Sequence, residues 1–589
     1  MTDLSSVAKV VSVAPDLIQI EVRSSIDYQN LDVQLELGSY LKISDDNGLS
    51  VVAIVKSYRI KDSVSDILGQ HPSDTQFIVD AQPVGRLRDG KFSRGGKQIA
   101  IPPTRVEIAE KGVLDEIYSG IQSEKQFSFG SLAQNDQVRL IIDGDKFFGK
   151  HIGVVGSTGA GKSCTVAKIL QEGTRRSEGQ QEKGILNNSH VIIFDLHGEY
   201  STAFPHANLI DTGNLSLPYW LMNSEELEEM FIESAEHNSH NQISQFRQAV
   251  IANKNRHYGN EGKIASYDSP VYFSLREVIN FLGNLNSETI GKNPNEGVPK
   301  LADGTLVHKR EDRYFAEQLS FAPSSIKSGE KATNGPFHGE FNRFLMRLEA
   351  RLNDKRLGFL LEPKNAHGEE ARTEDLPEIL GQFTGYGKNK EENRNITIID
   401  LSGVPFEVLS VVVSLISRAI FTFAFHFKKH KLSQGRDLPY LLVYEEAHNY
   451  VPRSEGAKYG SVKKSIERIA KEGRKYGVSL MIVSQRPSEI SETVFSQCNN
   501  FVAMRLTNPA DQNYVKRLLP DTVSAITDTL PTLEKQEVIV IGDSVSIPSL
   551  IRVDDIEDRP DSRDIDFHTE WKMDWLDVAV PRIIAKWQA

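Results

Sequence analysis

The sequence predicts an α/β fold in which a mainly parallel sheet forms the core, preceded by a small β-barrel and interrupted by a helical insertion. Short apolar runs such as 151–155 and 440–444 have the composition of buried strands, and helical segments separate them. Residues 1–145 contain β-branched runs between Asp-Asn-Gly, Arg-Asp-Gly and Pro-Pro turn signals, without intervening helices. The predicted units are 1–145, 146–214, 215–394, 395–550 and 551–589, of which the second and fourth together make the core.

Length and composition set the broad class of protein. A chain of 589 residues is too long for one hydrophobic core and divides into three or four domains of roughly 100–200 residues. The formal charge of −12 argues against a uniformly basic coat for nucleic acid, but it leaves room for a local basic channel. Cys164 and Cys498 are the only cysteines, which excludes a disulfide framework and a zinc–cysteine cluster. The first residues lack the basic-then-apolar plan of a signal peptide, so we expect a reducing cytoplasm.

The β-rich unit 1–145 contains no candidate catalytic group. Several short strands without helices between them indicate a small antiparallel barrel or sandwich. We therefore expect this unit to be an accessory module that serves assembly.

The segment GSTGAGKS, Gly156–Ser163, matches G-x-x-x-x-G-K-[ST] at every specified position. An apolar strand precedes it and a segment with helical periodicity follows it, which a chance glycine-rich turn would not require. In this context loop N–H groups and the helix N-terminus hold phosphate, Lys162 reaches the β- and γ-phosphates, and the Ser163 hydroxyl ligates Mg²⁺. The residues assigned to nucleotide binding here are Gly156, Ser157, Thr158, Gly159, Ala160, Gly161, Lys162, Ser163 and Cys164.

The next predicted strand ends in Asp195, within FDLHGEY at 194–200. Because the carboxyl ends of strands carry the ligands in open α/β sheets, we expect Asp195 to face the nucleotide. The alternative is that Asp195 caps the segment that follows it.

A pair of acids, Glu445 and Glu446, follows the apolar strand 440–444. At the carboxyl end of a strand, Glu445 can hold the Mg²⁺ shell while Glu446 orients and deprotonates the attacking water. The alternative is a solvated helix start. The strand after this pair ends at Gln485, which is placed to sense the γ-phosphate. No N-K-x-D signature for guanine is present, so we expect ATP.

The region 215–394 is predicted to be a helical subdomain, and Asn223 and Glu226 within it have capping-box spacing. At the C-terminus, residues 554–574 carry nine acids and three bases ahead of an apolar segment. This tail could strap onto an adjacent subunit or dock an effector protein.

One apolar segment, 408–427, is long enough to cross a membrane. Arg418 lies in its middle, where a charge costs about 2.5–3.5 kcal/mol on insertion scales. We therefore expect a helix buried in the α/β core, and no membrane association.

The stretch 453–475 contains eight basic and three acidic residues, a net charge of +5 in an acidic protein. That asymmetry is expected of a pore that follows phosphates, although a solvated helix face would give it as well. No aromatic residues alternate with the charges to stack on bases, so a DNA contact here should be independent of sequence.

Taken in order, GSTGAGKS, FDLHGEY, IDLSG, LLVYEEAH, EGRKYGVSLMIVSQRPSEIS and QCNNFVAMRLTNPADQNYV resemble the motifs of the HerA family of hexameric DNA-translocating ATPases, relatives of FtsK. The resemblance covers essentially the whole chain in order and is weakest in 215–394. It implies a RecA-like core, an N-terminal HAS-barrel, a ring of six subunits, ATP with Mg²⁺, and double-stranded DNA in the pore. It also implies a partner, either a NurA-like nuclease or a sirtuin-like or nuclease effector in phage defence.

The resemblance suggests roles for two basic residues. Arg474, in EGRKYG, matches an arginine that completes the active site of the neighbouring subunit, although a salt bridge with Glu472 is the simpler alternative. Lys150 matches a basic position that contacts nucleotide across the interface, where the family usually has arginine.

A different class of function stays open at this point. The ring could be a nucleotide-gated scaffold that activates an associated effector, with ATP turnover as its regulator. Protein remodelling is disfavoured, since no unfoldase domain is recognisable.

Overall fold

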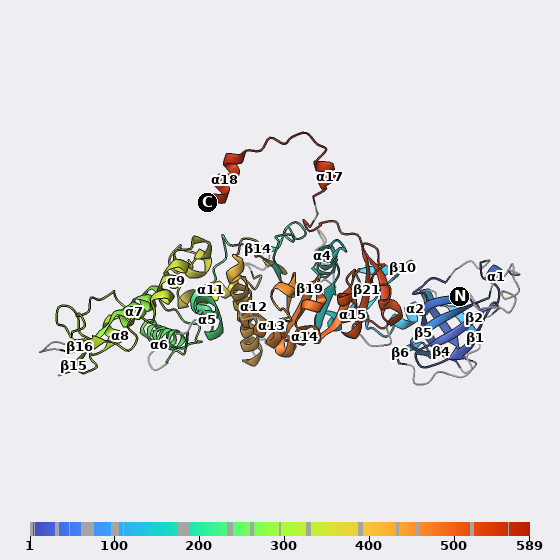
Figure 1. Cartoon of the computed structure of the whole chain (residues 1–589). Helices are drawn as coiled ribbons and strands as arrows, with labels where there is room; N and C mark the ends of the chain where they lie inside the picture. The colour runs from blue at the N-terminus through green and yellow to red at the C-terminus, as the bar shows by residue number, and fades with distance from the viewer. Residues whose placement is uncertain are drawn as a thin grey trace.

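The computed structural model describes residues 4, 6–29, 35–45, 48–60, 76–95, 105–109, 111–174, 186, 188–232, 239–258, 264–293, 296–325, 331–386, 393–430, 435–454, 460–518, 524–562 and 565–588. The N-terminal β domain lies at one end of an elongated molecule, the α/β core in the middle and the helical insertion at the other end (Figure 1). The C-terminal tail leaves the core and arches over it (Figure 1).

The N-terminal domain is a small barrel-like antiparallel sheet with the strand order β1-β2-β5-β4-β3-β7, and β6 pairs with β5. Alternate residues of β2, IQIEV, are buried, as expected for a strand with one face on a core. Ahead of β1, Leu4 N donates to Val106 O of β7 at 2.9 Å, which brings the two ends of the sheet together. Its elements are β1 (Ala8–Val13), β2 (Ile18–Val22), α1 (Ser25–Gln29), β3 (Tyr40–Ser44), β4 (Leu49–Ile60), β5 (Phe77–Arg88), β6 (Lys91–Arg94) and β7 (Arg105–Ile108).

The core is one sheet with the order β10-β9-β22-β21-β20-β12-β19-β18-β13-β17-β14. The run from β20 to β14 is parallel, and β12 and β13 are buried along their whole length, which is typical of a parallel sheet covered on both faces. The predicted α/β fold with a mainly parallel P-loop ATPase core is therefore confirmed. The strands are β9 (Gly130–Leu132), β10 (Asn135–Arg139), β12 (His151–Val155), β13 (His190–Asp195), β14 (Asn208–Ile210), β17 (Ile396–Asp400), β18 (Tyr440–Tyr444), β19 (Val478–Ser484), β20 (Cys498–Ala503), β21 (Glu537–Gly542) and β22 (Ser549–Val553).

The sheet is wider than the seven strands expected from the sequence, because the short strands β9, β10, β14 and β22 extend its two edges. Residues 130–139 were assigned to the N-terminal unit by the sequence, but β9 pairs with β22 of the core and β10 pairs with β9. These strands were not predicted individually, and a pairing with a strand some 400 positions away has no local signal. A short pair, β8 (Gln126–Phe127) and β11 (Ile142–Asp143), lies beside them, and α2 (Lys111–Tyr118) links the two domains.

Helices cover the core sheet, and the longest, α12, is the apolar segment noted in the sequence. It is long and apolar enough to cross a membrane, but 72% of its most apolar window is buried inside the protein. Arg418 of α12 donates to Glu226 of the insertion at 2.7 and 3.0 Å and to Leu221 O, so the charge in the middle of this helix is paired. The core helices are α3 (Gly144–Phe148), α4 (Lys162–Thr174), α12 (Phe406–Lys429), α13 (Gly460–Glu472), α14 (Glu492–Phe495), α15 (Pro509–Leu518) and α16 (Ser524–Thr527).

The insertion is mainly helical, and β15 and β16 form a two-stranded antiparallel sheet within it. The capping box is present as predicted, because Glu226 N donates to Asn223 Oδ1 at 2.9 Å and Asn223 N donates back to Glu226. The elements are α5 (Ser224–Phe231), α6 (Ser239–His257), α7 (Leu275–Ser287), β15 (Thr289–Asn293), α8 (Arg310–Arg313), β16 (Lys331–Asn334), α9 (Asn342–Leu352), α10 (Gly358–Leu361) and α11 (Leu376–Gly381).

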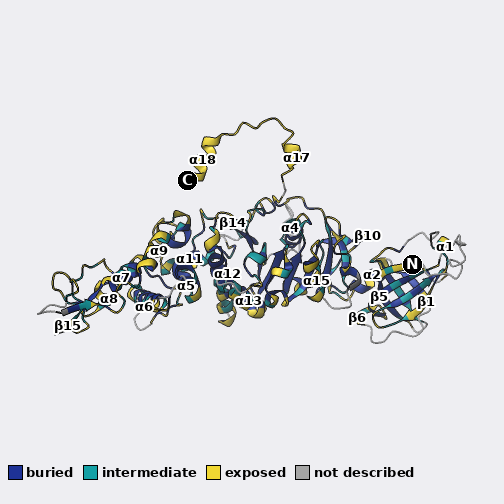
Figure 2. Cartoon of the chain, viewed as in Figure 1, coloured by how far each residue is buried: buried dark blue, intermediate teal, exposed yellow. Residues whose placement is uncertain are grey.

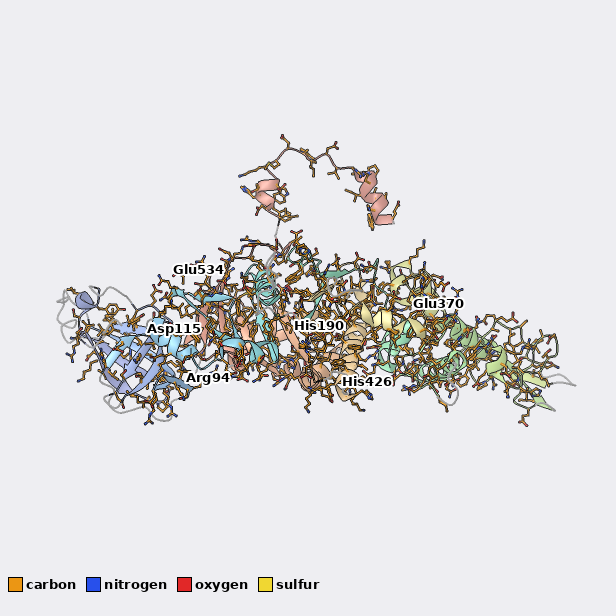
Figure 3. The ribbon with its side chains drawn as sticks, turned by 180° about the vertical axis from the view of Figure 1, so that it is seen from behind. Arg94, Asp115, His190, Glu370, His426 and Glu534 are labelled. Carbon is orange, nitrogen blue, oxygen red and sulfur yellow. The ribbon has the colours of Figure 1, made fainter. Side chains whose placement is uncertain are left out.

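Arg94, at the end of β6, joins the N-terminal domain to the core (Figure 3). Its guanidinium donates to Ser546 O at 2.9 Å, to Gly542 O at 2.5 Å and to Val545 O. These carbonyls belong to the last residue of β21 and the turn that follows it, so Arg94 attaches the domain at that end of β21.

The C-terminal tail begins after β22. Its last part, beyond residue 564, carries α17 (Phe567–Glu570) and α18 (Val580–Gln588), and every side chain described in that part is exposed (Figure 2). Trp571, Trp575 and Trp587 are among these exposed residues. The start of the tail is held to the core, because Gln171 donates to Asp558 O at 2.9 Å and Thr202 to Arg559 O at 2.7 Å.

Candidate nucleotide-hydrolysis site

The P-loop connects the carboxyl end of β12 to the first turn of α4. Gly159 and Gly161 have φ angles of 74° and 96°, in the left-handed region that favours glycine. A Cβ at Gly156 would lie 2.7 Å from the Cβ of Met504, so this position also requires glycine. The loop is fixed from one side by Ser157, whose N–H donates to Arg505 O at 2.8 Å.

The residues that end the loop lie at the N-terminus of α4. Ala160 and Lys162 are buried, Cys164 is half-buried in the first helical turn, and no contact of Cys164 gives it a chemical role. The loop N–H groups, the helix N-terminus and the Lys162 ammonium together fit a nucleotide phosphate.

Gln485 lies beside the P-loop, as the sequence predicts for a residue that senses the γ-phosphate. It follows β19, and its Oε1 accepts a hydrogen bond from Thr158 Oγ1 at 2.5 Å. The backbone adds a second link, because Gly156 N donates to Ser484 O at 3.3 Å. The P-loop is therefore hydrogen-bonded directly to the end of β19 and to the residue that follows it.

Asp195 is almost fully buried at the end of β13, where it accepts hydrogen bonds from the backbone of the loop that follows. The donors are the N–H groups of His197 at 3.3 Å, Gly198 at 2.9 Å and Tyr200 at 2.9 Å. Burial raises the pKa of this carboxyl, and the N–H donors act in the opposite direction. In this structure Asp195 shapes the 196–200 loop through these backbone bonds; no helix begins in that described segment for it to cap.

The loop shaped by Asp195 brings Glu199, which was not among the predicted site residues, to the P-loop serine. Ser163 Oγ donates to Glu199 Oε2 at 3.1 Å. Burial is the largest cause of the raised pKa of Glu199, and the negative charges of Asp195 and Glu446 raise it further. In the sequence, Glu199 is visible as the acid of FDLHGEY, four positions after Asp195. The direction in which its side chain points depends on how the loop folds.

Glu445 is buried at the end of β18, and Oε1 of its carboxylate accepts a hydrogen bond from the Tyr200 hydroxyl. Burial raises the pKa of Glu445 to about 7, while the Tyr200 hydroxyl and the charge of Lys162 lower it. Lys162 and Glu445 are therefore close enough to interact electrostatically.

Glu446, the predicted general base, has a φ angle of 47°, an uncommon conformation for a residue other than glycine. Its Oε2 is buried and accepts no hydrogen bond from the part of the chain that the structure describes. His448 Nδ1 lies 3.3 Å from that oxygen, and burial lowers the pKa of His448. A buried carboxylate oxygen with a free lone pair can accept a proton from water.

The P-loop follows the carboxyl end of β12, whereas Lys150 and Arg474 lie at the amino ends of the core strands. Lys150 directly precedes β12, and Arg474 lies in the 3-10 turn Gly473–Tyr476 ahead of β19; β12 and β19 are neighbouring parallel strands. Lys150 pairs with Asp543, and Arg474 donates to Asn499 Oδ1 at 3.2 Å, while Glu472 pairs with Arg468. The five residues of β12, roughly 16 Å of extended chain, separate these amino ends from the P-loop. Neither Lys150 nor Arg474 therefore reaches a phosphate bound at the P-loop of its own chain.

The basic stretch 453–475 is partly neutralised on the surface. Arg453 pairs with Glu492 at 2.7 Å and Lys464 with Glu225 at 2.8 Å, and all four side chains are exposed. Lys458 belongs to 455–459, outside the described residues. Surface pairs of this kind contribute little to stability and can exchange for phosphate partners.

The side chains at the P-loop fit ATP with Mg²⁺. Glycines at the positions that need them leave room for phosphate, and Lys162 supplies a cation. The Ser163 hydroxyl and the Glu199 and Glu445 carboxylates supply oxygen atoms, which Mg²⁺ prefers. Mg²⁺ keeps several waters and substrate phosphates in its shell, so a few protein oxygens are sufficient.

Comparison with known proteins agrees with this site. Residues 127–420 match the family model described as "Helicase HerA, central domain". The DNA double-strand break repair helicase HerA of Sulfolobus acidocaldarius is 26% identical over 82% of this chain and 79% of its own length. The HerA of Sulfurisphaera tokodaii is 25% identical over 92% of this chain and 93% of its own. A probable helicase of Methanocaldococcus jannaschii is 22% identical over 92% of this chain and 90% of its own.

Solved structures with a related fold include VirB4 of Thermoanaerobacter pseudethanolicus, with 13% identity, a TM-score of 0.43, and coverage of 74% of this chain and 98% of that one. The plasmid coupling protein TrwB in complex with a non-hydrolysable ATP analogue has 13% identity and a TM-score of 0.43, over 78% and 95% of the two chains. The family match and the relatives over most of the chain, joined to the P-loop geometry, identify this protein as an ATP-hydrolysing member of the HerA helicase family.

Proposed function

We propose that this chain is an ATP-driven double-stranded DNA translocase that works as a homohexameric ring with a nuclease or sirtuin-like effector. The observation that carries the proposal is the separation of Lys150 and Arg474 from the P-loop of their own chain. Two basic residues at the amino ends of these strands can complete a nucleotide site only on another subunit. The names of the relatives, DNA double-strand break repair helicases, support DNA as the substrate.

The residues of this chain divide the hydrolysis reaction among them. Lys162 binds the β- and γ-phosphates, and Ser163 with Glu445 would hold Mg²⁺, which would supply charge neutralisation at the phosphates. Glu446 accepts the proton of the attacking water through its free Oε2. Gln485, hydrogen-bonded to Thr158, senses the loss of γ-phosphate and transmits the change to β19. Arg474, which acts in the neighbouring site, lies ahead of the other end of this strand.

DNA contact is proposed for the exposed basic residues of 453–475, which would hold the phosphates without reading sequence. The C-terminal tail, with its exposed tryptophans, supports binding to a neighbouring subunit or to the effector. The proposed location is the cytoplasm, and the effector's chemistry decides between DNA end processing and phage defence.

Triplex displacement tests this function. A third strand annealed to duplex DNA is stripped off by a motor that moves along the duplex, so the full chain with Mg²⁺ and ATP should release it. The Glu446→Gln variant should bind the same DNA and release nothing.

Steady ATP hydrolysis that duplex DNA does not stimulate, with no third strand released, would contradict translocation. If ATP binding then controlled the activity of an attached effector, the nucleotide-gated scaffold would be the correct function.

A further inference from the structure

The Ser163 hydroxyl faces a carboxylate that comes from the 196–200 loop and not from the predicted acid pair. Ser163 Oγ donates to Glu199 Oε2 at 3.1 Å, whereas the Glu445 carboxylate accepts the Tyr200 hydroxyl on the other side of the same loop. Residues 199 and 200 thus connect the P-loop serine and the acid of β18. Neither contact is implied by the spacing of the motifs.

The backbone around Glu199 is fixed from two directions. Asp195 accepts the N–H groups of Gly198 and Tyr200, each at 2.9 Å, and Glu199 O accepts Asp561 N at 2.9 Å from the start of the tail. Gly198 has a φ of 71°, and a Cβ there would lie 3.3 Å from Asp400 Oδ2. These contacts restrict the loop to a path on which the half-buried Glu199 side chain points at Ser163.

A serine hydroxyl has one proton and two acceptor lone pairs. When its proton is donated to Glu199, both lone pairs of Ser163 Oγ are available for a cation, and the carboxylate adds negative charge beside it. A serine–glutamate pair elsewhere on the surface would have no such consequence. Ser163, however, is the last residue of the P-loop and the predicted Mg²⁺ ligand.

We propose that Glu199 is a positioning residue for Mg²⁺ at the nucleotide site, acting through the Ser163 hydroxyl. The proposal deepens the ATP-hydrolysis site described above and rests on it. Glu199 sets the strength of cation binding, and ATP itself is held by the P-loop whether or not the cation is present.

The test separates nucleotide binding from metal binding. Glu199→Gln keeps the shape and an oxygen that can accept from Ser163, but it removes the charge. A fluorescent ATP analogue should bind the variant and the wild type equally in EDTA. The Mg²⁺ concentration needed for half of the Mg²⁺-dependent signal should rise by about 10–100-fold, the range found when groups behind a metal ligand are changed. Mn²⁺ bound with a non-hydrolysable analogue, followed by electron paramagnetic resonance, should show the same loss.

Glu172→Gln is the matched control, because it removes the same charge from α4 at a position that pairs with Lys168 at 2.6 Å. Residue 172 lies nine positions after Ser163, about 13 Å along the helix, so Mg²⁺ affinity should not change. In a Ser163→Ala background, Glu199→Gln should have a much smaller effect, since the hydroxyl through which it acts is absent.

Either of two results for Glu199→Gln would overturn the role of Glu199 and leave the ATPase assignment intact. One is an unchanged Mg²⁺ and Mn²⁺ affinity, and the other is an equal loss of analogue binding with and without metal. The second result would make the residue a support of the P-loop. A wild-type protein with no Mg²⁺-dependent nucleotide binding would instead overturn the ATPase assignment, and this proposal with it.

Discussion

The Tyr200 hydroxyl donates a hydrogen bond to Oε1 of Glu445 inside the core, where Tyr200 is fully buried and Glu445 nearly so. The bond ties the loop after β13 to the acid at the end of β18, two neighbouring parallel strands. It also controls the charge of Glu445, because a hydrogen bond to the ionised form lowers the pKa of a carboxyl group that burial raises to about 7.

Tyr200→Phe should move the acid side of the pH–rate profile to higher pH. A carboxyl with a raised pKa is ionised above that pKa and becomes protonated as pH falls through it, so hydrolysis should decline below about pH 7 in the absence of other effects. Removing the hydroxyl removes a group that lowers this pKa, and the decline should begin at higher pH. Measuring kcat against pH for both proteins checks this. An acid limb at the same pH in both would show that Glu445 does not control the rate.

Glu446→Gln should keep ATP bound but block hydrolysis, because an amide cannot accept the proton of the attacking water. A general base typically contributes about 10²–10⁴-fold, so kcat should fall by at least about 100-fold while nucleotide affinity stays the same. Single-turnover hydrolysis and equilibrium binding measure the two quantities. Near wild-type hydrolysis would transfer the role to Glu445 or Asp195.

His151 should make the protein less stable as pH falls below about 6.5. The ring is buried, accepts Leu480 N at 3.0 Å and lies 2.8 Å from Ala470 O, and burial lowers its pKa to about 4. The unfolded chain binds a proton below about pH 6.5 while the folded chain does not until about pH 4, so stability is full above 6.5 and is lost between these values, by up to about 1.4 kcal/mol per pH unit.

The check compares unfolding midpoints at about pH 7.5 and pH 5.5. His151→Asn should be less stable than wild type at the higher pH but lose less on acidification, whereas His206→Asn, at an exposed position, should behave as wild type. Equal losses for all three proteins would show that His151 takes up its proton in the folded state as well.

Removal of residues 1–109 should abolish ring assembly and leave the core folded. This cut takes away β1–β7 but keeps β9, which pairs with β22, and β10, which pairs with β9. A cut at residue 145 would remove those strands and expose the backbone of β22, so that protein should aggregate. Light scattering and circular dichroism distinguish the outcomes. Hexamers formed by the 110–589 chain would remove the N-terminal domain from assembly.

The comparison of those two cuts shows how far the sequence predicts the fold. The P-loop and seven of the core strands were recognised because each has its own local pattern: an apolar run, a glycine loop, an acid at a strand end. The edge strands β9 and β10 have three and five residues, and their partner is set by contacts distant in sequence.

The candidate site divides in the same way. Lys162, Ser163, Glu445, Glu446 and Gln485 were predicted from strand ends and motif positions. Glu199 was missed because its direction depends on three hydrogen bonds from one loop to the buried Asp195, a side chain whose expected partner was the nucleotide.

The measurement that tests the shared site most directly is ATP hydrolysis by mixed variants. Arg474→Ala and Lys162→Ala should each be inactive, because one removes the residue offered to the neighbour and the other removes the cation of the P-loop. After subunit exchange has been demonstrated with labelled chains, mixtures contain some interfaces with an intact Lys162 and an intact Arg474. Hydrolysis should partly recover in these mixtures, with a maximum at an intermediate ratio. No recovery at any ratio, with exchange and ATP binding both verified, would contradict a site shared between subunits.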